Sequence, residues 1–426
     1  MPSKYNPFRP GSIVSPGMFC GRYEEFVGTE KALFQTKNGN AQHFLIHGER
    51  GIGKSSLLYS LDLVAQNQVS SFEDEKFNFL TVTIELEPTT SYAELIQKIG
   101  VELRRAVATR RPALETAKAT WDFLRRWEVM GVKYSGSEKE LKPHELLDEL
   151  TFTMEQTLNQ FGPEIDGILI LIDEADKPGA AANLGEFVKI FTERLTKRGC
   201  NRVCLGLAGL STVLQHMRQS HESSLRIFQI FTLGPLSTSE RLEVIDKGLA
   251  EATAKNGFEV TISDEAKSVI SELSEGYPHF LQQFAYSAFE VDRDNAIDVV
   301  DVNLGAIQED RGAIEQLGLK YFHELYFDQI ASDEYRGVLR IMSEQFDGWV
   351  TKASLRHATK LKESTINNAI TALKKRHIII PKPGVAGVYK LPTKSFAVWI
   401  RAFSKAHEDS QSAKMSSQPP TARTEV

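Results

Sequence analysis

The apolar residues of this chain gather in five short runs, and helical patterns separate most of them. Each run has the length and composition of a buried β-strand, and the runs cover Phe44–His47, Phe79–Leu86, Ile168–Ile172, Val203–Leu207 and Phe228–Leu233. Strands that alternate with helices are typical of a parallel sheet covered by helices on both faces. The pattern therefore predicts an α/β fold over the first half of the chain.

The pattern changes after Pro235, where the predicted strands end. With 426 residues the chain is long enough for several domains. We expect an α/β domain over residues 1–235, with a helical insertion at about 92–160, and a helical domain over 236–315 with helix caps at Ser237 and Ser263. A smaller domain is predicted over 316–405, and the polar tail, 406–426, is expected to be disordered.

A glycine-rich segment lies between the first predicted strand and a helical pattern. It matches the pattern G-x-x-x-x-G-K-[ST] of phosphate-binding loops. Such a loop turns several backbone N–H groups, and the positive end of a helix dipole, toward one phosphate. Lys54 would reach the β- and γ-phosphates of ATP, and Ser55 would bind Mg²⁺. The residues predicted to contact ATP are Gly48, Glu49, Arg50, Gly51, Ile52, Gly53, Lys54, Ser55 and Ser56.

Two acids end the third predicted strand, Ile168–Ile172. This is the Walker B arrangement, in which a buried strand carries acids to the sheet edge where ligands bind. Asp173 is predicted to bind Mg²⁺, directly or through water. Glu174 is predicted to orient and deprotonate the attacking water, so Lys54, Asp173 and Glu174 form the predicted catalytic core. The same acids also begin a helicase motif, but the chain lacks the downstream helicase motifs.

Polar residues beside the fourth and fifth predicted strands are further candidates. Arg226 is the first candidate for an arginine finger that reaches the γ-phosphate of a neighbouring subunit, and the alternative is a surface arginine paired to an acid. The next candidates for the finger are Arg218, Arg194 and Arg198. Ser211 or Thr212 either senses the γ-phosphate or, in the case of Ser211, only caps a helix.

Together these features resemble the AAA+ and STAND branch of the P-loop ATPases, and most of all the initiator-type subgroup related to origin-recognition proteins. The other segments that carry the resemblance are Asn6-Pro7-Phe8-Arg9-Pro10-Gly11, Phe19-Cys20-Gly21-Arg22 and Gly276-Tyr277-Pro278. The resemblance implies that Phe8 and Arg22 lie near the adenine and that Pro278 brings a helical lid against the nucleotide. It also implies a homo-oligomer. The chain has no sensor asparagine and carries His279 where many relatives have a lid arginine; both departures lean toward the signalling branch.

The pattern of residues 332–401 predicts a winged helix, with helices at Glu334–Ser343, near Leu355 and after a cap at Ser364, followed by a hairpin. Residues 320–405 contain 15 Lys plus Arg against 7 Asp plus Glu, although the whole chain has a net charge of −6. A basic module on an acidic chain suits a polyanion, so residues 350–391 are predicted to bind double-stranded DNA. The residue types for groove contacts are Thr365, Asn367, Asn368, Thr371, Lys374 and Lys375. Protein binding is the alternative.

The composition excludes several classes of protein. Three cysteines, Cys20, Cys200 and Cys204, imply no disulfide framework and fit the cytoplasm. Cys200 and Cys204 have no nearby His or Cys that would complete a zinc site. The chain shows no apolar stretch of membrane-spanning length and no signal peptide, so no membrane partner is expected.

Two functions fit the predicted fold, which is a P-loop NTPase sheet with a helical lid followed by a winged helix. The first is an ATP-hydrolysing switch that forms homo-oligomers and binds DNA. The second is a STAND-type signalling ATPase of a bacterial antiviral defence system, which would act through an effector or nuclease partner. A scaffold without hydrolysis is the third reading, and the presence of Lys54, Asp173 and Glu174 argues against it.

Overall fold

The computed structural model describes residues 4–13, 19–110, 142–308, 311–330, 332–345, 348–359, 361–376 and 378–402. The chain forms two compact units. The first, Ser12–Pro235, is called the α/β unit; the second, Met1–Gly11 with Leu236–Val426, is called the helical unit. Residues 1–11 thus belong with the helical unit, whereas the sequence analysis assigned them to the α/β domain. The middle of the predicted insertion and the predicted disordered tail lie outside the described residues.

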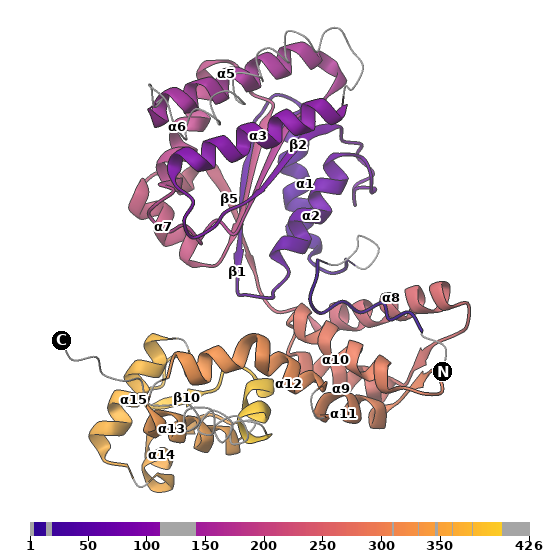
Figure 1. Cartoon of the computed structure of the whole chain (residues 1–426), viewed down its shortest axis with the longest axis vertical. Helices are drawn as coiled ribbons and strands as arrows, with labels where there is room; N and C mark the ends of the chain where they lie inside the picture. Colours follow the sequence, from indigo (N-terminus) through magenta and orange to yellow (C-terminus); the bar gives the residue numbers. More distant parts are fainter. Residues whose placement is uncertain are drawn as a thin grey trace, which may run out of the picture. The chain divides into compact units, whose positions relative to one another are not determined.

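A five-stranded parallel sheet forms the centre of the α/β unit (Figure 1). Its strands are β1 (His43–Gly48), β2 (Phe79–Glu85), β3 (Gly167–Asp173), β4 (Val203–Gly209) and β5 (Phe228–Leu233), in the order β2-β3-β4-β1-β5. The three inner strands are apolar because helices cover both of their faces. The predicted α/β fold with a parallel sheet is confirmed.

Helices cover the two faces of this sheet in separate groups (Figure 1). One face carries α1 (Tyr23–Lys37) and α2 (Lys54–Ala65). The other carries α3 (Tyr92–Arg110), α5 (Pro143–Phe161), α6 (Leu184–Lys197) and α7 (Thr212–Ser220), whose apolar residues share one buried cluster with the strands. Short 3₁₀ turns at Gly162–Glu164 and Ser224–Ile227 precede β3 and β5. The order of strands brings the ends of β1, β3 and β4 to one edge.

The first part of the helical unit is a group of helices with a small sheet. The helices are α8 (Thr238–Asn256), α9 (Asp264–Ser274), α10 (Pro278–Val291) and α11 (Val299–Ile307), and β6 (Thr261–Ile262) pairs with β7 (Ala296–Ile297). The expected caps are confirmed, because Ser237 Oγ accepts from the backbone of Glu240 and Ser263 Oγ from that of Ala266. We call this group the lid helices.

The N-terminal arm, residues 4–9, packs on the lid helices. Lys4 pairs with the buried carboxylate of Asp292, and the Tyr5 hydroxyl donates to Glu251 over 2.6 Å. The backbone N–H of Arg9 donates to Gln282 over 2.8 Å. Phe8 is 2% exposed, and its ring meets that of Phe289 edge-on. The arm is therefore part of the lid's own core.

The C-terminal module, residues 332–402, follows α12 (Ala313–Leu317) and π-helical turns at Gly318–Phe322 and Glu324–Asp328. Its elements come in the order α13 (Asp333–Glu344), β8 (Val350–Thr351), α14 (Lys352–Ala358), α15 (Glu363–Lys375), β9 (Ile380–Pro381) and β10 (Val388–Lys390), and a helix at 394–402 closes it. The strands form an antiparallel sheet in the order β8-β10-β9. The predicted cap at Ser364 is wrong, because α15 begins at Glu363, after Lys362, two residues earlier than a cap at Ser364 would place it.

The closing helix of the module is packed against the lid side of the same unit. Ser395 donates to the carbonyl of Leu273 in α9, and Glu275 accepts from the backbone of Lys394. Trp399 is fully buried among Phe322, Tyr326 and other aromatic rings. A Cβ on Gly318 would lie 1.9 Å from Trp399 Nε1, so only glycine fits this position.

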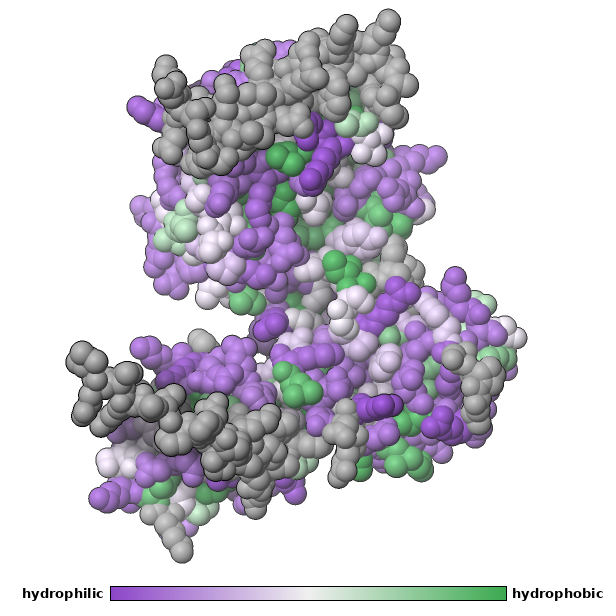
Figure 2. All heavy atoms as spheres, viewed as in Figure 1, coloured by the Kyte–Doolittle hydropathy of each residue, from purple (hydrophilic) through white to green (hydrophobic). Residues whose placement is uncertain are grey.

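Hydrophilic residues cover most of the visible face of both units, and the exposed apolar residues form small separate patches (Figure 2). Within the described part of the chain, none of the helices combines the length and apolar character that crossing a membrane requires.

Candidate nucleotide-binding site

The phosphate loop joins the end of β1 to the start of α2. Gly51 and Gly53 have φ of 76° and 100°, a left-handed backbone that favours glycine. Gly48 is needed for a different reason, since a Cβ there would lie 2.7 Å from the carbonyl oxygen of Leu233 in β5. Ile52 is 1% exposed and anchors the loop in the core. The loop thus has the backbone shape that its sequence predicts, with the N-terminus of α2 behind it.

Lys54 lies over its own loop. Its ammonium group donates to the carbonyl oxygens of Gly48, over 3.1 Å, and Glu49, over 2.9 Å. Burial lowers the pKa of Lys54, and the carboxylates of Asp173, Glu174, Asp176 and Glu49 oppose that shift. The acids at the end of β3 are therefore near enough to Lys54 to act on its charge, while its ammonium group is bonded to the loop itself. A phosphate would replace the carbonyl partners of its ammonium group.

Arg22 supports the loop from the side of α1. It is 7% exposed, and its guanidinium donates to the carbonyl of Ile52 over 3.1 Å. The Arg22 backbone adopts a left-handed conformation with φ of 60° where α1 begins. The residue predicted to lie near the adenine is thus joined directly to the phosphate loop.

The acids of the second motif stand where β3 ends. Asp173 lies opposite Glu85 of β2, and its Oδ1 accepts from the backbone of Glu174 over 2.8 Å. Glu174 has φ of 53°, an uncommon conformation for a residue other than glycine. Asp176, which is buried, accepts from the backbone of Leu210 over 2.7 Å and so ties this turn to the end of β4. Backbone strain of this kind is often found at functional sites.

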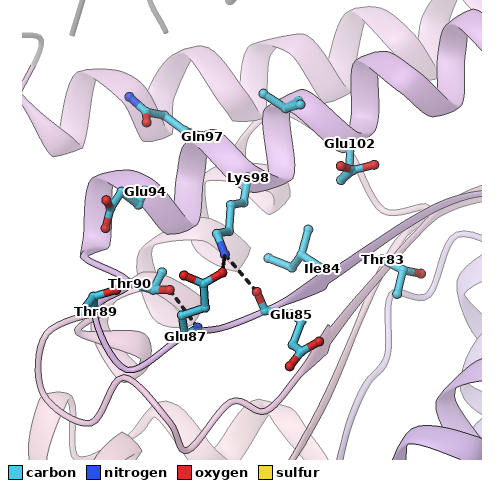
Figure 3. A pocket seen from close by; sticks show the side chains of 11 residues that line it. Thr83, Ile84, Glu85, Glu87, Thr89, Thr90, Glu94, Gln97, Lys98 and Glu102 are labelled. Atoms are coloured by element: carbon cyan, nitrogen blue, oxygen red, sulfur yellow. Dashed lines mark hydrogen bonds and ion pairs between the residues drawn. The ribbon is translucent and has the colours of Figure 1, made fainter. Parts of the chain in front are cut away.

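A lysine links Glu174 to the edge strand of the sheet. Lys177 Nζ lies 3.2 Å from Glu85 and 3.7 Å from Glu174. Burial raises the pKa of Glu174, and the charge of Lys177 counters this rise. Glu85 also lines a pocket of about 460 Å³ between β2 and α3, where Lys98 donates to Glu87 and to the Glu85 carbonyl (Figure 3). The sequence analysis missed Lys177, although it follows the Walker B acids by three residues.

His47 was also missed, although a polar residue at the end of an apolar strand is an indication of a special role. Its imidazole is 9% exposed, and Nδ1 lies 3.1 Å from Ser211 Oγ and Nε2 lies 2.9 Å from Thr232 Oγ1. Ser211, the candidate sensor and cap, makes no side-chain cap bond to α7. Its hydroxyl is instead joined to the residue that precedes the phosphate loop.

Arg226 lies at the opposite edge of the sheet from the phosphate loop. It precedes β5, whose first residue, Phe228, pairs with His43 at the start of β1. A strand of six residues spans roughly 17–20 Å, so Arg226 does not reach the phosphate loop of its own chain. Arg226 is exposed, and its guanidinium has no ion pair within the described residues. Its role as an arginine finger toward a neighbouring chain therefore stays a prediction, and a surface arginine stays the alternative.

The other candidate arginines separate into two groups. Arg194 donates to the carbonyl of His144, and Arg198 forms ion pairs with Asp148 and Glu155. Both are therefore engaged in holding α6 against α5. Arg218 of α7 is exposed and stays a candidate beside Arg226.

Phe8 and Pro278 belong to the helical unit. Phe8 is buried in the arm, and Pro278 is the first residue of α10, where the fixed φ of proline suits the start of a helix. Their predicted contacts with a nucleotide stay predictions.

The candidate Mg²⁺ ligands are the Ser55 hydroxyl and the Asp173 carboxylate. In the described part of the chain, no group of three or more His, Cys, Asp or Glu could hold a metal ion by itself. This set fits Mg²⁺, which binds through one or two protein oxygens together with water and substrate phosphates. The ion, when bound with ATP, would neutralise charge on the transferred phosphate.

The C-terminal module presents basic and polar residues on one side of α15. A pocket of about 550 Å³ is lined by Lys352, Asn367, Ile370, Thr371, Lys374, Lys375 and Tyr389. In the adjoining hairpin the ammonium groups of Lys382 and Lys390 lie 5.6 and 5.2 Å from the ring centre of Trp349. At the start of α15, Glu363 is close to Lys352 and Arg356 of α14. Four of the six predicted groove-contact residues, Asn367, Thr371, Lys374 and Lys375, thus line one pocket with Lys352, and Thr365 and Asn368 do not line it.

Comparison with known proteins places this fold among ATPases. No protein-family model matches the chain. The Walker-type ATPase of Pyrococcus abyssi is 17% identical, with a TM-score of 0.52, and the match covers 93% of this chain and 98% of that one. The ORC2 protein of Aeropyrum pernix, solved in ADPNP–ADP complexes, is 14% identical with a TM-score of 0.55, over 94% and 96% of the two chains. The chain shares the fold of these two proteins.

This shared fold confirms, at the level of the fold, the resemblance drawn from the motifs. A curated protein of Methanocaldococcus jannaschii, named an uncharacterized HTH-type transcriptional regulator, is 23% identical over 376 residues, which are 86% of this chain and 85% of the relative. The alternative of a STAND-type defence ATPase gains no support from these comparisons.

Proposed function

We propose that this chain is an Mg²⁺-dependent ATPase switch that assembles with copies of itself and binds double-stranded DNA. The observation that carries the proposal is the meeting of the phosphate loop with the acids at the end of β3, where Lys54 is half-buried and lies near Asp173 and Glu174. In this proposal ATP binds Gly48–Ser56 with Arg22 beside the loop. Mg²⁺ binds Ser55 and Asp173.

Hydrolysis in this proposal depends on Glu174 as the base for the attacking water. A carboxylate of raised pKa is suited to accept a proton near neutral pH. Glu174→Gln is expected to lower kcat by about 10²- to 10⁴-fold while the Kd for ATP stays within about twofold. Lys54→Ala, by contrast, is expected to remove ATP binding. Equal turnover in wild type and Glu174→Gln would remove Glu174 from the mechanism.

DNA binding is proposed for residues 350–391. The support is the basic surface around α15 and the name of the curated relative, which describes a helix-turn-helix regulator. Because lysine contacts to phosphates release counterions, log Kd should rise steeply with log salt concentration. A flat dependence of affinity on salt would argue against phosphate contacts.

One experiment tests assembly and DNA together. ATPase activity and particle mass are measured in parallel with ATP, with and without a duplex oligonucleotide. Growth in mass on ATP, and a change in turnover on DNA, is the expected outcome. Assembly without any response to DNA would leave the ATPase switch and remove DNA as its partner.

A further inference from the structure

His47 makes hydrogen bonds to two hydroxyl groups. We call the three groups, Ser211 Oγ, the imidazole and Thr232 Oγ1, the His47 bridge. The bonds are 3.1 and 2.9 Å long and use both ring nitrogens. The imidazole is buried, whereas Ser211 and Thr232 are exposed residues. The buried imidazole therefore positions two exposed hydroxyl groups, at the edge of the sheet where the phosphate loop lies.

The bridge joins three elements that the proposed ATPase cycle uses. His47 directly precedes Gly48 at the end of β1, and β1 lies between β4 and β5. Ser211 follows β4, whose Gly209 pairs with His47. Thr232 pairs with His47 from β5, three residues before the chain leaves the α/β unit at Pro235. A movement of the phosphate loop would therefore be transmitted to β4 and β5, the two strands that flank β1.

The imidazole also limits how the two hydroxyl groups can donate and accept hydrogen bonds. A neutral imidazole has one N–H donor and one acceptor nitrogen. Burial, and then the charge of Lys54, lower the pKa of His47, which favours the neutral ring. One hydroxyl must then accept from the ring and keep its own O–H free to donate. The other must donate to the ring and keep its lone pairs free to accept.

We propose that His47 is a positioning residue that orients the Ser211 hydroxyl toward the terminal phosphate of ATP. In this role Ser211, set by His47, stands where the chain lacks a sensor asparagine, and Thr232 fixes the far side of the ring. This inference rests on the proposed ATPase function and adds a residue to it. No bond is made or broken by the bridge, which acts through the placement of one hydroxyl.

The test is a double-mutant cycle on the full chain. Ser211→Ala and His47→Phe are each expected to lower kcat by about tenfold and to raise the Kd for ATP by about fivefold, because the hydroxyl contacts the terminal phosphate in the bound state and more strongly in the transition state. The double variant is expected to be no slower than either single variant. Thr232→Val, which removes only the far hydroxyl, should lower kcat by about threefold.

Thr196→Ala in α6 is the control, since it removes an exposed hydroxyl outside the proposed site, and it should leave kcat within about twofold. Effects of Ser211→Ala and His47→Phe that multiply, or an unchanged kcat in either, would overturn the proposal. Ser211→Ala and Thr232→Val alter only exposed positions, so they also serve if His47→Phe fails to fold.

A wild-type chain that binds ATP without hydrolysing it would contradict the proposed function and still allow the bridge to be tested. The readout is then the ratio of the Kd for ADP to the Kd for ATP, measured by calorimetry. Ser211→Ala and His47→Phe should reduce that ratio by the same factor, about fivefold or more. A ratio equal to that of the wild type would overturn the role of His47 independently of turnover.

Discussion

Lys54, Asp173 and Glu174 stand at the ends of buried parallel strands, whereas the lysines of α15 stand on an exposed helix face. In the first case the register of the sheet fixes the distance between motifs that are far apart in the sequence. In the second, Lys374 and Lys375 are exposed beside Lys352 and Tyr389, and their charge and exposure are what mark them as candidates. The candidate residues of the α/β unit are therefore identified by the spacing of motifs, whereas those of the C-terminal module are identified by the composition of its surface.

The largest expected effect comes from removing the arginine with which, in our proposal, one chain completes the ATP site of a second copy. Arg226→Ala should lower kcat by about 10³-fold or more, because an arginine finger stabilises charge in the transition state of phosphoryl transfer. Arg105→Ala, which removes an exposed arginine of α3, is the control, and Arg218→Ala tests the second candidate for the finger. Mixing Arg226→Ala chains, which keep an intact phosphate loop, with Lys54→Ala chains, which keep an intact finger, should restore turnover in mixed assemblies. Failure of the mixture to recover activity would mean that Arg226 does not act between chains.

A second change acts on the helical unit alone. Gly318→Ala places a methyl group 1.9 Å from Trp399 Nε1 and should destabilise that unit by about 3 kcal/mol through overpacking. Hydrogen exchange monitored by mass spectrometry should show faster exchange at 313–330 and 394–402, and unchanged exchange in β1 and β3. Gly337→Ala in α13, where nothing lies within 4 Å of the added Cβ, is the control and should stabilise by about 0.5–1 kcal/mol.

The predictions made from the sequence agree with the structure more closely in the main sheet of the α/β unit than in the helical unit. Apolar runs identified every strand of the main sheet. Inner strands such as Ile168–Ile172 are apolar throughout because both of their faces are covered, whereas the edge strand β5 is largely exposed and was identified by its composition alone. The cap at Ser364 could not be identified reliably, because Lys362 begins α15 without a capping side chain. The His47 bridge and the packing of residues 4–9 on the lid depend on contacts between distant segments, which no local pattern encodes.

A third substitution alters how the stability of the α/β unit depends on pH and leaves the helical unit unchanged. Burial raises the pKa of Glu30 in α1 to about 7, above its ordinary value of 4.5. The folded chain then binds a proton that the unfolded chain has lost between pH 4.5 and 7, so stability falls as pH rises through this window. Glu30→Gln should therefore stabilise the α/β unit at pH 8 by about 2–3 kcal/mol and have little effect at pH 4.5.

The measurement is urea unfolding at both pH values, followed by exchange in peptides of the α/β unit. Glu24→Gln, on the exposed face of the same helix, is the matched control. A Glu30→Gln variant whose stability falls with pH as steeply as the wild type's would contradict the assignment to Glu30.

The smallest expected effect concerns the DNA surface. Replacing both Lys374 and Lys375 with Ala should weaken duplex binding by about tenfold at 0.15 M salt and lower the slope of log Kd against log salt by about 2, because two phosphate contacts are lost. Lys255→Ala in α8 is the control and should leave the slope unchanged. ATP turnover without DNA should be the same in all three proteins, and a change there would link α15 to the catalytic site.

The chain passes between its two units at two places, after Gly11 and after Pro235, because residues 4–9 are held by the lid helices. Cutting a single peptide bond after Pro235 would therefore not release the catalytic half. The fragment that begins in the N-terminal arm would stay attached through the Lys4–Asp292 pair, the Tyr5 and Arg9 hydrogen bonds and the buried Phe8 ring. A nicked molecule should migrate as two bands on a denaturing gel and elute as one particle from a sizing column.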